Sequence, residues 1–461
     1  MNTNEPYKRS FLFCASIINI CFLTGLFYVA WFEYYRGNIV IPFFKRGNWV
    51  MLAIYAILLL FFSKMYGGLK FGKLRKTEVI LSQMLAVIFV NGIVYIQISL
   101  LAYSFLNIVP IVLMTLADFV VITLWTLLVG AAYNHFFPPW NMLLVFGNYA
   151  ADKLLYKIST RKDKYVIRDS ISAEESMENI AEKMKEYDAV LIGDISAVTR
   201  NDILKYCYGN SIRAYVIPKL SDIIMMGTEQ INIFDTPIFL SRGFALSFDQ
   251  KLMKRIVDIV LAVILLVLAS PFLLLTALAV KLYDGGSVLF SQTRLTLNGK
   301  EFQIYKFRSM IENAEEDGVA KLATQNDRRI TPVGKFIRKT RLDELPQIFN
   351  VLKGDMSFVG PRPERPEIME EYRRIMPEFA YRMRVKAGLT GFAQIFGKYN
   401  TTPYDKLKLD LYYIENYSLW MDFKLILMTV KIVFKGESTE GIQEGQTTAD
   451  ERAEHSGQGM M

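Results

Sequence analysis

The chain has 461 residues, of which 52% are hydrophobic and 13% aromatic, and a formal net charge of +8. This length allows two or three domains, and the long apolar runs favour a membrane protein over one that binds nucleic acid. Three cysteines without a CxxC pair, and two histidines far from the most charged segment, argue against a disulfide framework, a zinc site and histidine acid–base catalysis. A bound metal would need oxygen ligands, which favours Mg²⁺ or Mn²⁺.

Residues 1–140 contain four long apolar stretches and predict a transmembrane four-helix bundle. The stretches are Phe11–Trp31, Trp49–Phe62, Ile80–Phe105 and Ile108–Tyr133, and the second is shorter than the roughly 20 residues that a span needs. Lysines and arginines gather before the first stretch, between the second and third, and after the fourth. This distribution predicts that both ends of the bundle face the cytoplasm, although three basic residues in the first loop oppose that orientation.

One acidic residue, Asp118, lies inside the fourth apolar stretch. A carboxyl group within a membrane is often functional. The simpler interpretation, which we favour, is a hydrogen bond to Asn91 or Gln97 on the neighbouring helix.

Residues 141–242 alternate short apolar runs with helix-like segments and predict a small Rossmann-like β/α domain with a parallel sheet. The expected strands are Leu143–Phe146, Tyr165–Ile167, Ala189–Ile192 and Ala214–Ile217, and the expected helices are Ala173–Tyr187 and Ala197–Tyr208. The first strand is followed by FGNYAADKL, in which Gly147 stands alone instead of a GxGxxG turn. We therefore favour a docking or regulatory role over a nucleotide site.

A fifth long apolar segment, residues 254–283, carries Ser270 and Pro271 near its middle. Proline interrupts helical hydrogen bonding. A single crossing would place the basic remainder of the chain outside the cell, against the usual charge distribution. Two interpretations remain open on these grounds: a bent, re-entrant helix that returns to the same face, and a fifth span that tolerates its proline.

The most charged part of the chain surrounds a carboxylate pair, Asp343 and Glu344, and suits a divalent metal with a phosphorylated substrate. Its cations are Lys335, Arg338, Lys339, Arg341, Lys353 and Arg362. Thr331-Pro332 predicts one helix running toward Thr340, and Leu345-Pro346 begins a second that ends before Gly354.

At the start of the second helix, beside Arg338 and Arg341, Asp343 is expected to have a lowered pKa and to be an ionised nucleophile. The alternative is that Asp343 only caps the helix.

Three further segments offer ligand-binding groups. Lys306 and Arg308 follow a predicted strand, Phe302–Tyr305, and two cations around an aromatic residue suit a phosphate. Two prolines fix the backbone around Arg362. The glycines of KAGLTG, residues 386–391, would allow a close approach to a ligand or form a plain turn.

The chain resembles the monotopic phosphoglycosyl transferases, also called bacterial sugar transferases. The resemblance rests on KFRSM (306–310), LDELPQIFNVLKGDMSFVGPRP (342–363), KAGLTGFAQIFG (386–397) and the Ser-Pro break in the apolar helix. It covers residues 251–435, a mostly α catalytic domain whose re-entrant membrane helix spans 254–283. Residues 1–140 and 141–242 resemble the large subgroup of that family. The overall fold expected is thus a membrane α/β protein, followed by a disordered tail at 436–461.

The resemblance implies transfer of a hexose-1-phosphate from a UDP-hexose to undecaprenyl phosphate, with release of UMP. This is the first membrane step of capsule, exopolysaccharide or O-antigen synthesis. It implies that Asp343 is the nucleophile, forms a covalent phosphosugar and contacts Mg²⁺, while Glu344 supports catalysis. The implied substrate-binding residues are Lys306, Arg308, Arg338, Arg341, Arg362 and Arg384, and the implied helix break is at Ser270 and Pro271.

The resemblance also implies a place in the cell: the bacterial inner (cytoplasmic) membrane, with several spans and the catalytic domain on the cytoplasmic face. The expected partners are the lipid bilayer and a second copy of the chain in a homodimer. Binding to nucleic acid is not expected. The alternative function is that of a catalytically inactive scaffold in a polysaccharide assembly complex.

Overall fold

The computed structural model describes residues 4–41, 43, 45–147, 155, 158, 161–241, 243, 245–311, 327, 329–397 and 401–433. The tail expected to be disordered, 436–461, lies outside these residues. The chain divides into two compact units, Met1–Lys219 and Leu220–Met461. The first unit holds both the apolar N-terminal region and the parallel sheet, and the division falls before the domain boundary at 242 that the sequence suggested.

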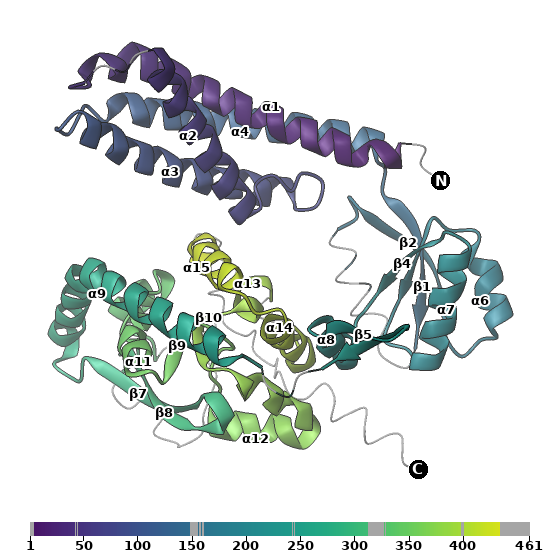
Figure 1. Ribbon diagram of the computed structural model, residues 1–461. Coiled ribbons are helices and arrows are strands. Elements are labelled where there is room, and N and C mark those ends of the chain that lie inside the picture. Colours follow the sequence, from purple (N-terminus) through teal and green to yellow (C-terminus); the bar gives the residue numbers. More distant parts are fainter. Residues whose placement is uncertain are drawn as a thin grey trace. The chain divides into compact units, whose positions relative to one another are not determined.

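The first unit begins with four long helices (Figure 1). They are α1 (Lys8–Ala30), α2 (Lys45–Tyr66), α3 (Lys76–Leu101) and α4 (Val109–Phe136), with short turns Glu5–Tyr7, Trp31–Tyr35 and Arg36–Asn38 around α1. Each predicted apolar stretch is a helix, and α2 is longer than its apolar core suggested because charged residues occupy its two ends. All four are long and apolar enough to cross a membrane, as is one helix of the second unit.

Polar side chains pair with one another inside the bundle. The Asn91 Nδ2 atom donates to Asp118 Oδ2 at 3.1 Å and to Thr115 Oγ1 at 2.8 Å, and the Tyr55 hydroxyl donates to Asn91 Oδ1 at 3.0 Å. The prediction that Asp118 bonds to Asn91 is therefore confirmed. Each bond joins groups that would otherwise lie unpaired in hydrocarbon.

A four-stranded parallel sheet with the order β2-β1-β3-β4 completes the first unit. Its strands are β1 (Trp140–Phe146), β2 (Tyr165–Ser172), β3 (Ala189–Ile192) and β4 (Arg213–Val216). Two helices, α6 (Met177–Met184) and α7 (Ala197–Gly209), begin at Ser176 and Ser196, whose hydroxyls accept backbone hydrogen bonds, and pack on one face (Figure 1). The predicted parallel β/α fold is confirmed.

The sheet is joined to one end of the bundle by charged contacts. Arg213 donates to Glu5 at 3.0 Å and lies over the Trp140 ring, 4.2 Å from its centroid. Arg161 and Lys164 donate to the carbonyl oxygen of Lys73, in the loop between α2 and α3. This is the end of the bundle where the basic loop residues gather.

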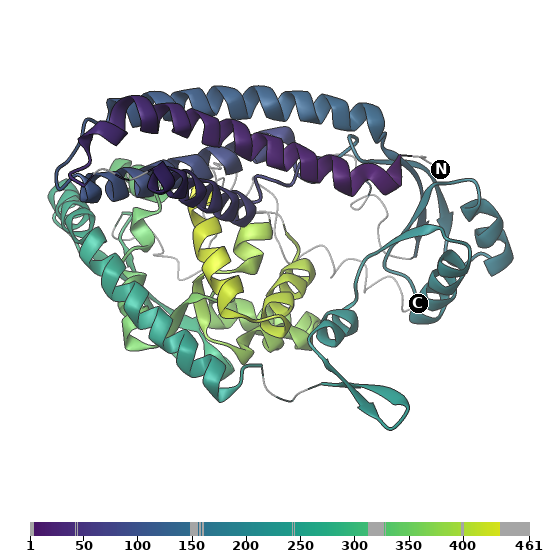
Figure 2. The same cartoon turned by 45° about the horizontal axis from the view of Figure 1, so that its top comes forward.

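The second unit is mostly helical. It opens with α8 (Leu220–Met226) and a hairpin of β5 (Glu229–Ile233) and β6 (Thr236–Leu240), which extends away from the rest of the unit (Figure 2). Then come α9 (Phe248–Asp284), β7 (Leu289–Leu295), the turn Leu297–Gly299, β8 (Glu301–Phe307), α10 (Pro332–Lys339), the turn η5 (Leu342–Glu344), α11 (Gln347–Lys353), β9 (Met356–Val359), α12 (Pro366–Ile375), the turn η6 (Pro377–Arg384), β10 (Ala387–Thr390), α13 (Phe392–Phe396), α14 (Pro403–Glu415) and α15 (Leu419–Val433).

Helix α9 is one continuous helix with Pro271 inside it (Figure 2). Because proline has no N–H, the carbonyl group of Val267, four residues earlier, loses its usual donor. The Ser270 hydroxyl donates to that carbonyl oxygen at 2.8 Å. The Ser270 side chain therefore supplies the hydrogen bond that the Pro271 backbone cannot make.

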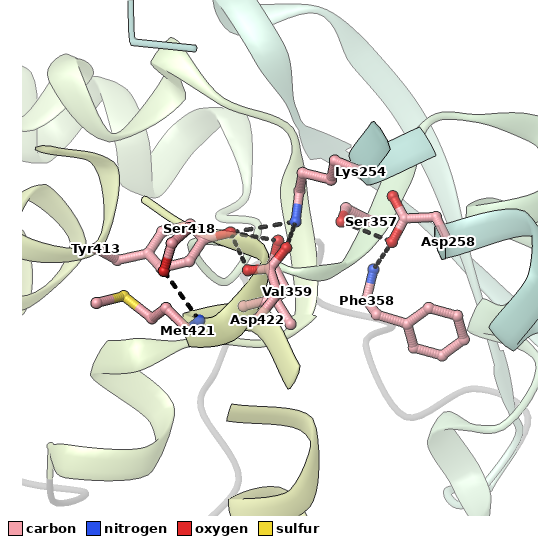
Figure 3. A network of polar contacts seen from close by, with 9 residues as sticks. All are labelled: Lys254, Asp258, Ser357, Phe358, Val359, Tyr413, Ser418, Met421 and Asp422. Atoms are coloured by element: carbon pink, nitrogen blue, oxygen red, sulfur yellow. Dashed lines mark hydrogen bonds and ion pairs between the residues drawn. The ribbon is translucent and has the colours of Figure 1, made fainter. Parts of the chain in front are cut away.

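The N-terminal part of α9 is fixed to the second unit by buried polar contacts (Figure 3). The Lys254 ammonium contacts Asp422 at 2.5 Å and the Tyr413 hydroxyl at 3.1 Å. One turn later, Asp258 accepts hydrogen bonds from the Ser357 hydroxyl and the Phe358 N–H, both at 3.0 Å. These bonds tie α9 to β9 and α15.

The C-terminal end of α9 is fixed to the same unit. Val280 packs in an apolar cluster with Phe307 and Ile337, and Asp284 forms an ion pair with Arg308 just after β8. Both ends of this long helix therefore contact one compact domain.

Two glycine-containing segments cross without room for a side chain. The Gly388 N–H donates to the Pro361 carbonyl oxygen and the Gly360 N–H donates to that of Thr390, both at 2.9 Å. A Cβ atom on Gly388 would lie 2.1 Å from the Gly360 nitrogen. The KAGLTG segment is thus part of parallel strand β10, beside β9, rather than the turn expected from its sequence.

Gly388→Ala is expected to destabilise the second unit by about 1–3 kcal/mol or more, because its methyl group meets backbone that cannot rotate away. Thermal unfolding of the purified protein measures the effect. Gly209→Ala is the control, since no atom lies within 4 Å of its Cβ position at the end of α7. Equal melting temperatures for Gly388→Ala and wild type would show that the two segments separate easily.

Candidate active site

The carboxylate pair lies in a tight turn between two short helices. The Thr331 hydroxyl accepts a hydrogen bond from the Gly334 N–H at 2.9 Å and starts α10, as its sequence predicts. The chain then reverses at Arg341, whose φ of 60° is unusual for a residue with a side chain and costs of order 1 kcal/mol. Turn η5 follows and carries both Asp343 and Glu344.

The second predicted helix is α11, which ends at Gly354 with a φ of 92°. Its N-cap residue is Pro346, and no side-chain cap bond is present there. The alternative interpretation, that Asp343 serves only as the cap, is therefore wrong. The Asp343 side chain is left for another role.

Glu344 joins three motifs that lie far apart in the sequence. Its Oε1 atom accepts a hydrogen bond from Lys306 Nζ at 3.0 Å and from Arg362 Nη2 at 2.9 Å. Arg362 is itself positioned by its backbone, because Arg382 Nη2 donates to the Arg362 carbonyl oxygen at 3.0 Å. The KFRSM, DELPQ and PRP segments thus converge on one carboxylate.

Arg382 belongs to a buried ion network that supports this arrangement. Its guanidinium group contacts Asp410 at 2.8 Å and Glu364 at 3.0 Å, and Lys406 also contacts Glu364. Charges of opposite sign therefore surround a side chain that is almost fully buried. Such a network is costly to disrupt, since loss of one partner leaves another charge buried without compensation.

Asp343 differs from its neighbour. Its side chain is 9% exposed, and none of the described residues donates a hydrogen bond to its Oδ1 atom. Burial raises the pKa of Asp343, and the charge of Glu344 raises it further, against the opposing effect of nearby cations. The prediction of a lowered pKa was wrong because it considered the arginines but not the removal of the carboxyl group from water.

Glu344 carries the stabilised negative charge. Burial alone would raise its pKa, but the charges of Lys306 and Arg362 outweigh burial and hold the pKa of Glu344 well below its usual range. The two adjacent carboxyl groups are therefore pushed in opposite directions. Glu344 is an anion held between two cations, and Asp343 is a buried carboxyl group whose ionisation is disfavoured.

The structure places the remaining predicted substrate-binding residues in different surroundings. Arg338 Nε donates to the Ser309 hydroxyl at 2.8 Å, and the charge of Arg338 acts on Asp343. Arg308 is buried against Asp284. Arg384 lies on the surface in η6, 5.4 Å from the Tyr381 ring centroid, and among the described residues it forms no hydrogen bond or ion pair with the carboxylate pair.

Sequence reasoning missed three residues that shape the site: Asp284, Glu364 and Arg382. Each lies beside a recognised motif or at a helix end, but the partner of each is distant in the sequence. Asp284 closes the apolar helix, and Glu364 follows PRP directly. For Asp284 and Glu364, a charged residue next to an apolar helix or a rigid turn was the feature of the sequence that could have indicated a role in the site.

The donor set around Asp343 fits a magnesium ion. Among the described residues no cluster of three or more His, Cys, Asp or Glu side chains could hold a metal alone. Mg²⁺ is usually held by one or two carboxylates together with substrate phosphates, so a complete protein cage is not needed. The unpaired Asp343 Oδ1 is the oxygen ligand that such an ion would take.

Asp343→Asn is expected to stabilise the folded protein at pH 7.5, with a rise in melting temperature of about 2–4 °C, or about 1 kcal/mol in a domain of this size. The folded wild type holds the Asp343 proton to a higher pH than the unfolded chain, whose carboxyl titrates near 3.8. Wild type therefore loses stability as the pH rises from about 4 through the raised pKa, and the advantage of the variant should vanish near pH 4.

Glu344→Gln supplies the matched contrast. Its lowered pKa means that ionisation stabilises the fold at every pH above its usual titration range, so this variant should melt below wild type at pH 7.5. A lower melting temperature for Asp343→Asn at that pH would contradict the assignment of burial as the dominant effect.

Comparison with known proteins supports this assembly of motifs. The family model described as bacterial sugar transferase matches residues 249–436. The UDP-glucose:undecaprenyl-phosphate glucose-1-phosphate transferase of Escherichia coli (strain K12) is 46% identical over 217 residues, which are 46% of this chain and 44% of that protein. The UDP-N-acetylgalactosamine-undecaprenyl-phosphate N-acetylgalactosaminephosphotransferase of Aeromonas hydrophila is 46% identical over 186 residues, 40% of this chain and 44% of that protein.

A shorter relative is covered more fully. The UDP-glucose:undecaprenyl-phosphate glucose-1-phosphate transferase of Caulobacter vibrioides is 45% identical over 186 residues, 39% of this chain and 68% of that protein. The chain spans less than half the length of the first two relatives. The residues that the family model matches, 249–436, include the carboxylate pair, almost all of helix α9 and the glycine crossing. On these grounds the chain belongs to the bacterial sugar transferase family.

Proposed function

We propose that the protein transfers a hexose-1-phosphate from a UDP-hexose to undecaprenyl phosphate, giving undecaprenyl-diphospho-hexose and UMP. The observation that carries this proposal is Asp343, a buried carboxyl group with an unpaired oxygen beside a fixed anion and several cations. The names of the relatives describe the same class of reaction with glucose or N-acetylgalactosamine. The product would begin a capsule, exopolysaccharide or O-antigen.

The chemistry proceeds in two displacements at phosphorus. One Asp343 oxygen attacks the sugar-bearing phosphorus of the UDP-hexose, and the bond to the UMP oxygen breaks, so UMP leaves with the electron pair. An oxygen of undecaprenyl phosphate then attacks the same phosphorus, and the bond to Asp343 breaks, which restores the carboxylate. Burial makes Asp343 a better nucleophile, because water does not solvate its charge.

Bound Mg²⁺ would offset the negative charge of the diphosphate during both displacements. Lys306 and Arg362 both donate to Glu344. Two positive charges surround one negative charge there, so this group of three side chains keeps a net positive charge near the site. Arg338 and Arg341, which act on Asp343 through their charge, would meet the phosphate oxygens.

Two other functions fit less well. An inactive scaffold would not need a buried carboxyl group that lacks a hydrogen-bond donor, since such a group destabilises the fold. A direct glycosyl transferase would break the bond at the sugar carbon and release UDP. The identity of the leaving nucleotide therefore separates the proposed reaction from that class.

We also propose that α9 is re-entrant. The helix is about 55 Å long at 1.5 Å per residue, yet both of its halves pack on the same unit. Ala262 lies in one apolar cluster of that unit, and Leu273, Ala277 and Val280 lie in or against another. A straight crossing would instead carry one end across about 30 Å of hydrocarbon, away from that unit. The faces of α9 that do not contact the unit expose apolar side chains: Val267, Leu268, Phe272, Leu274, Leu275 and Leu278.

On this proposal α9 lies in one leaflet of the inner membrane, and the catalytic unit lies on the cytoplasmic side, where nucleotide sugars are found. Trp420 and Phe423, exposed on α15, suit the level of the lipid headgroups. The family resemblance further suggests a homodimer.

The reaction is tested by incubating the purified full-length protein with undecaprenyl phosphate, Mg²⁺ and a panel of UDP-sugars. UMP release is expected, and it should stop when the metal is chelated. Asp343→Asn should lower the rate at least 10⁴-fold while the protein remains folded, because a carboxamide is a poor nucleophile. Release of UDP, or turnover by Asp343→Asn, would overturn the mechanism.

Pro271→Ala tests the re-entrant helix. Alanine restores an N–H to the Val267 carbonyl group and should straighten α9, which would carry part of the population across the membrane. A cysteine introduced at the exposed Lys300, with Cys14, Cys21 and Cys207 replaced, reports the side on which the domain lies. A membrane-impermeant maleimide applied to spheroplasts should label a fraction of Pro271→Ala and leave the parent unlabelled. Unchanged labelling and activity would show that the proline does not set the bend.

A further inference from the structure

A buried amide follows the carboxylate pair by one helical turn. Gln347 is the first residue of α11, its side chain is 3% exposed, and none of the described residues accepts a hydrogen bond from its Nε2 atom. Buried amide groups nearly always have partners, and an unmade bond costs about 1–3 kcal/mol. The amide nitrogen of Gln347 is therefore a donor that a bound ligand could satisfy.

The other buried amide on α11 shows the contrast. Asn350 donates from Nδ2 to the Gln303 carbonyl oxygen at 2.7 Å and accepts from the Tyr305 N–H at 3.0 Å. Asn350 thus uses both ends of its amide to hold α11 against β8. Gln347, one turn earlier, contributes no such bond from its nitrogen.

The backbone places Gln347 on the side of the carboxylate pair. Hydrogen bonds from Glu344 N to Arg341 O, and from Ile348 N to Leu345 O, make the path from η5 into α11 helical with about three residues per turn. At three to four residues per turn, positions 343 and 344 share a face with position 347. A buried donor and a buried acceptor, the Asp343 Oδ1 atom, are therefore both unpaired within one turn of each other.

A phosphoryl group satisfies both atoms at once. Its phosphorus is the electrophile for a carboxylate, and its nonbridging oxygens accept hydrogen bonds from an amide. We propose that the Gln347 amide donates a hydrogen bond to a nonbridging oxygen of the UDP-sugar phosphoryl group that Asp343 attacks, which makes Gln347 a substrate-binding residue. This inference rests on the proposed function.

Gln347→Met tests the assignment, because methionine has nearly the length and volume of glutamine but no N–H. The rate of UMP release is measured in a single turnover at saturating UDP-sugar, without lipid acceptor. We expect a loss of about 100-fold, typical of removing one donor to a developing oxyanion. The melting temperature should stay equal or rise, since a buried donor without a partner has been removed. A structural role for Gln347 would lower it instead.

Gln303→Met is the matched control. Gln303 is exposed on β8, and its Nε2 atom donates a hydrogen bond to the Thr293 hydroxyl at 2.9 Å. Its rate of UMP release should remain within twofold of wild type. Both substitutions exchange the same two residue types, so a difference between them reflects position and not chemistry.

Four outcomes would overturn the inference. A rate for Gln347→Met within twofold of wild type would mean that the amide meets only water. A fall of several degrees in melting temperature along with the rate would assign the amide to the fold. A loss seen only when undecaprenyl phosphate is supplied would assign it to the lipid phosphate. If wild type itself releases no UMP with any UDP-sugar, the proposed function fails first, and this assignment with it.

Discussion

The chemistry of the second unit depends on removing one carboxyl group from water while its neighbour stays charged. Asp343 and Glu344 are adjacent in the chain, yet the pKa values of the two move in opposite directions. Among the described residues, Lys306 and Arg362 donate hydrogen bonds to Glu344, whereas the Oδ1 atom of Asp343 has no donor. A pair of solvated carboxylates would repel an anionic substrate. Here Lys306 and Arg362 offset the charge of Glu344, and the Asp343 carboxyl group is buried beside it.

The arrangement requires support from a distance. The turn that carries the pair contains a strained Arg341, and strain of this kind persists only where surrounding structure fixes it. Helix α10 fixes one side through Ser309 and Arg338, and α11 fixes the other through Asn350. The Arg382 network holds the backbone of Arg362 in place. The second unit therefore holds the carboxylate pair and Arg362 on a scaffold of buried hydrogen bonds.

Local sequence signals predicted the helices, the parallel sheet and the segments that form the site. The boundaries of α10 and α11 followed from Thr331-Pro332 and Gly354, because caps and terminal glycines act within a few residues. The pairing of Asp118 with Asn91 followed from the cost of an isolated polar group in hydrocarbon. Burial was not predictable, because it depends on distant segments. That is why the direction of the Asp343 pKa shift was wrong, and why Arg382 and Asp284 were missed.

The crossing of Gly360 and Gly388 has a consequence for how the site varies among homologues and in engineered variants. Strand β10 and the segment that follows β9 touch through their backbones, so a side chain at either glycine displaces the other segment along with Arg362. Libraries that randomise only one of these two segments at a time would mostly yield inactive variants. Variants of this region are therefore better made at neighbouring positions with open space, and the two glycines left untouched.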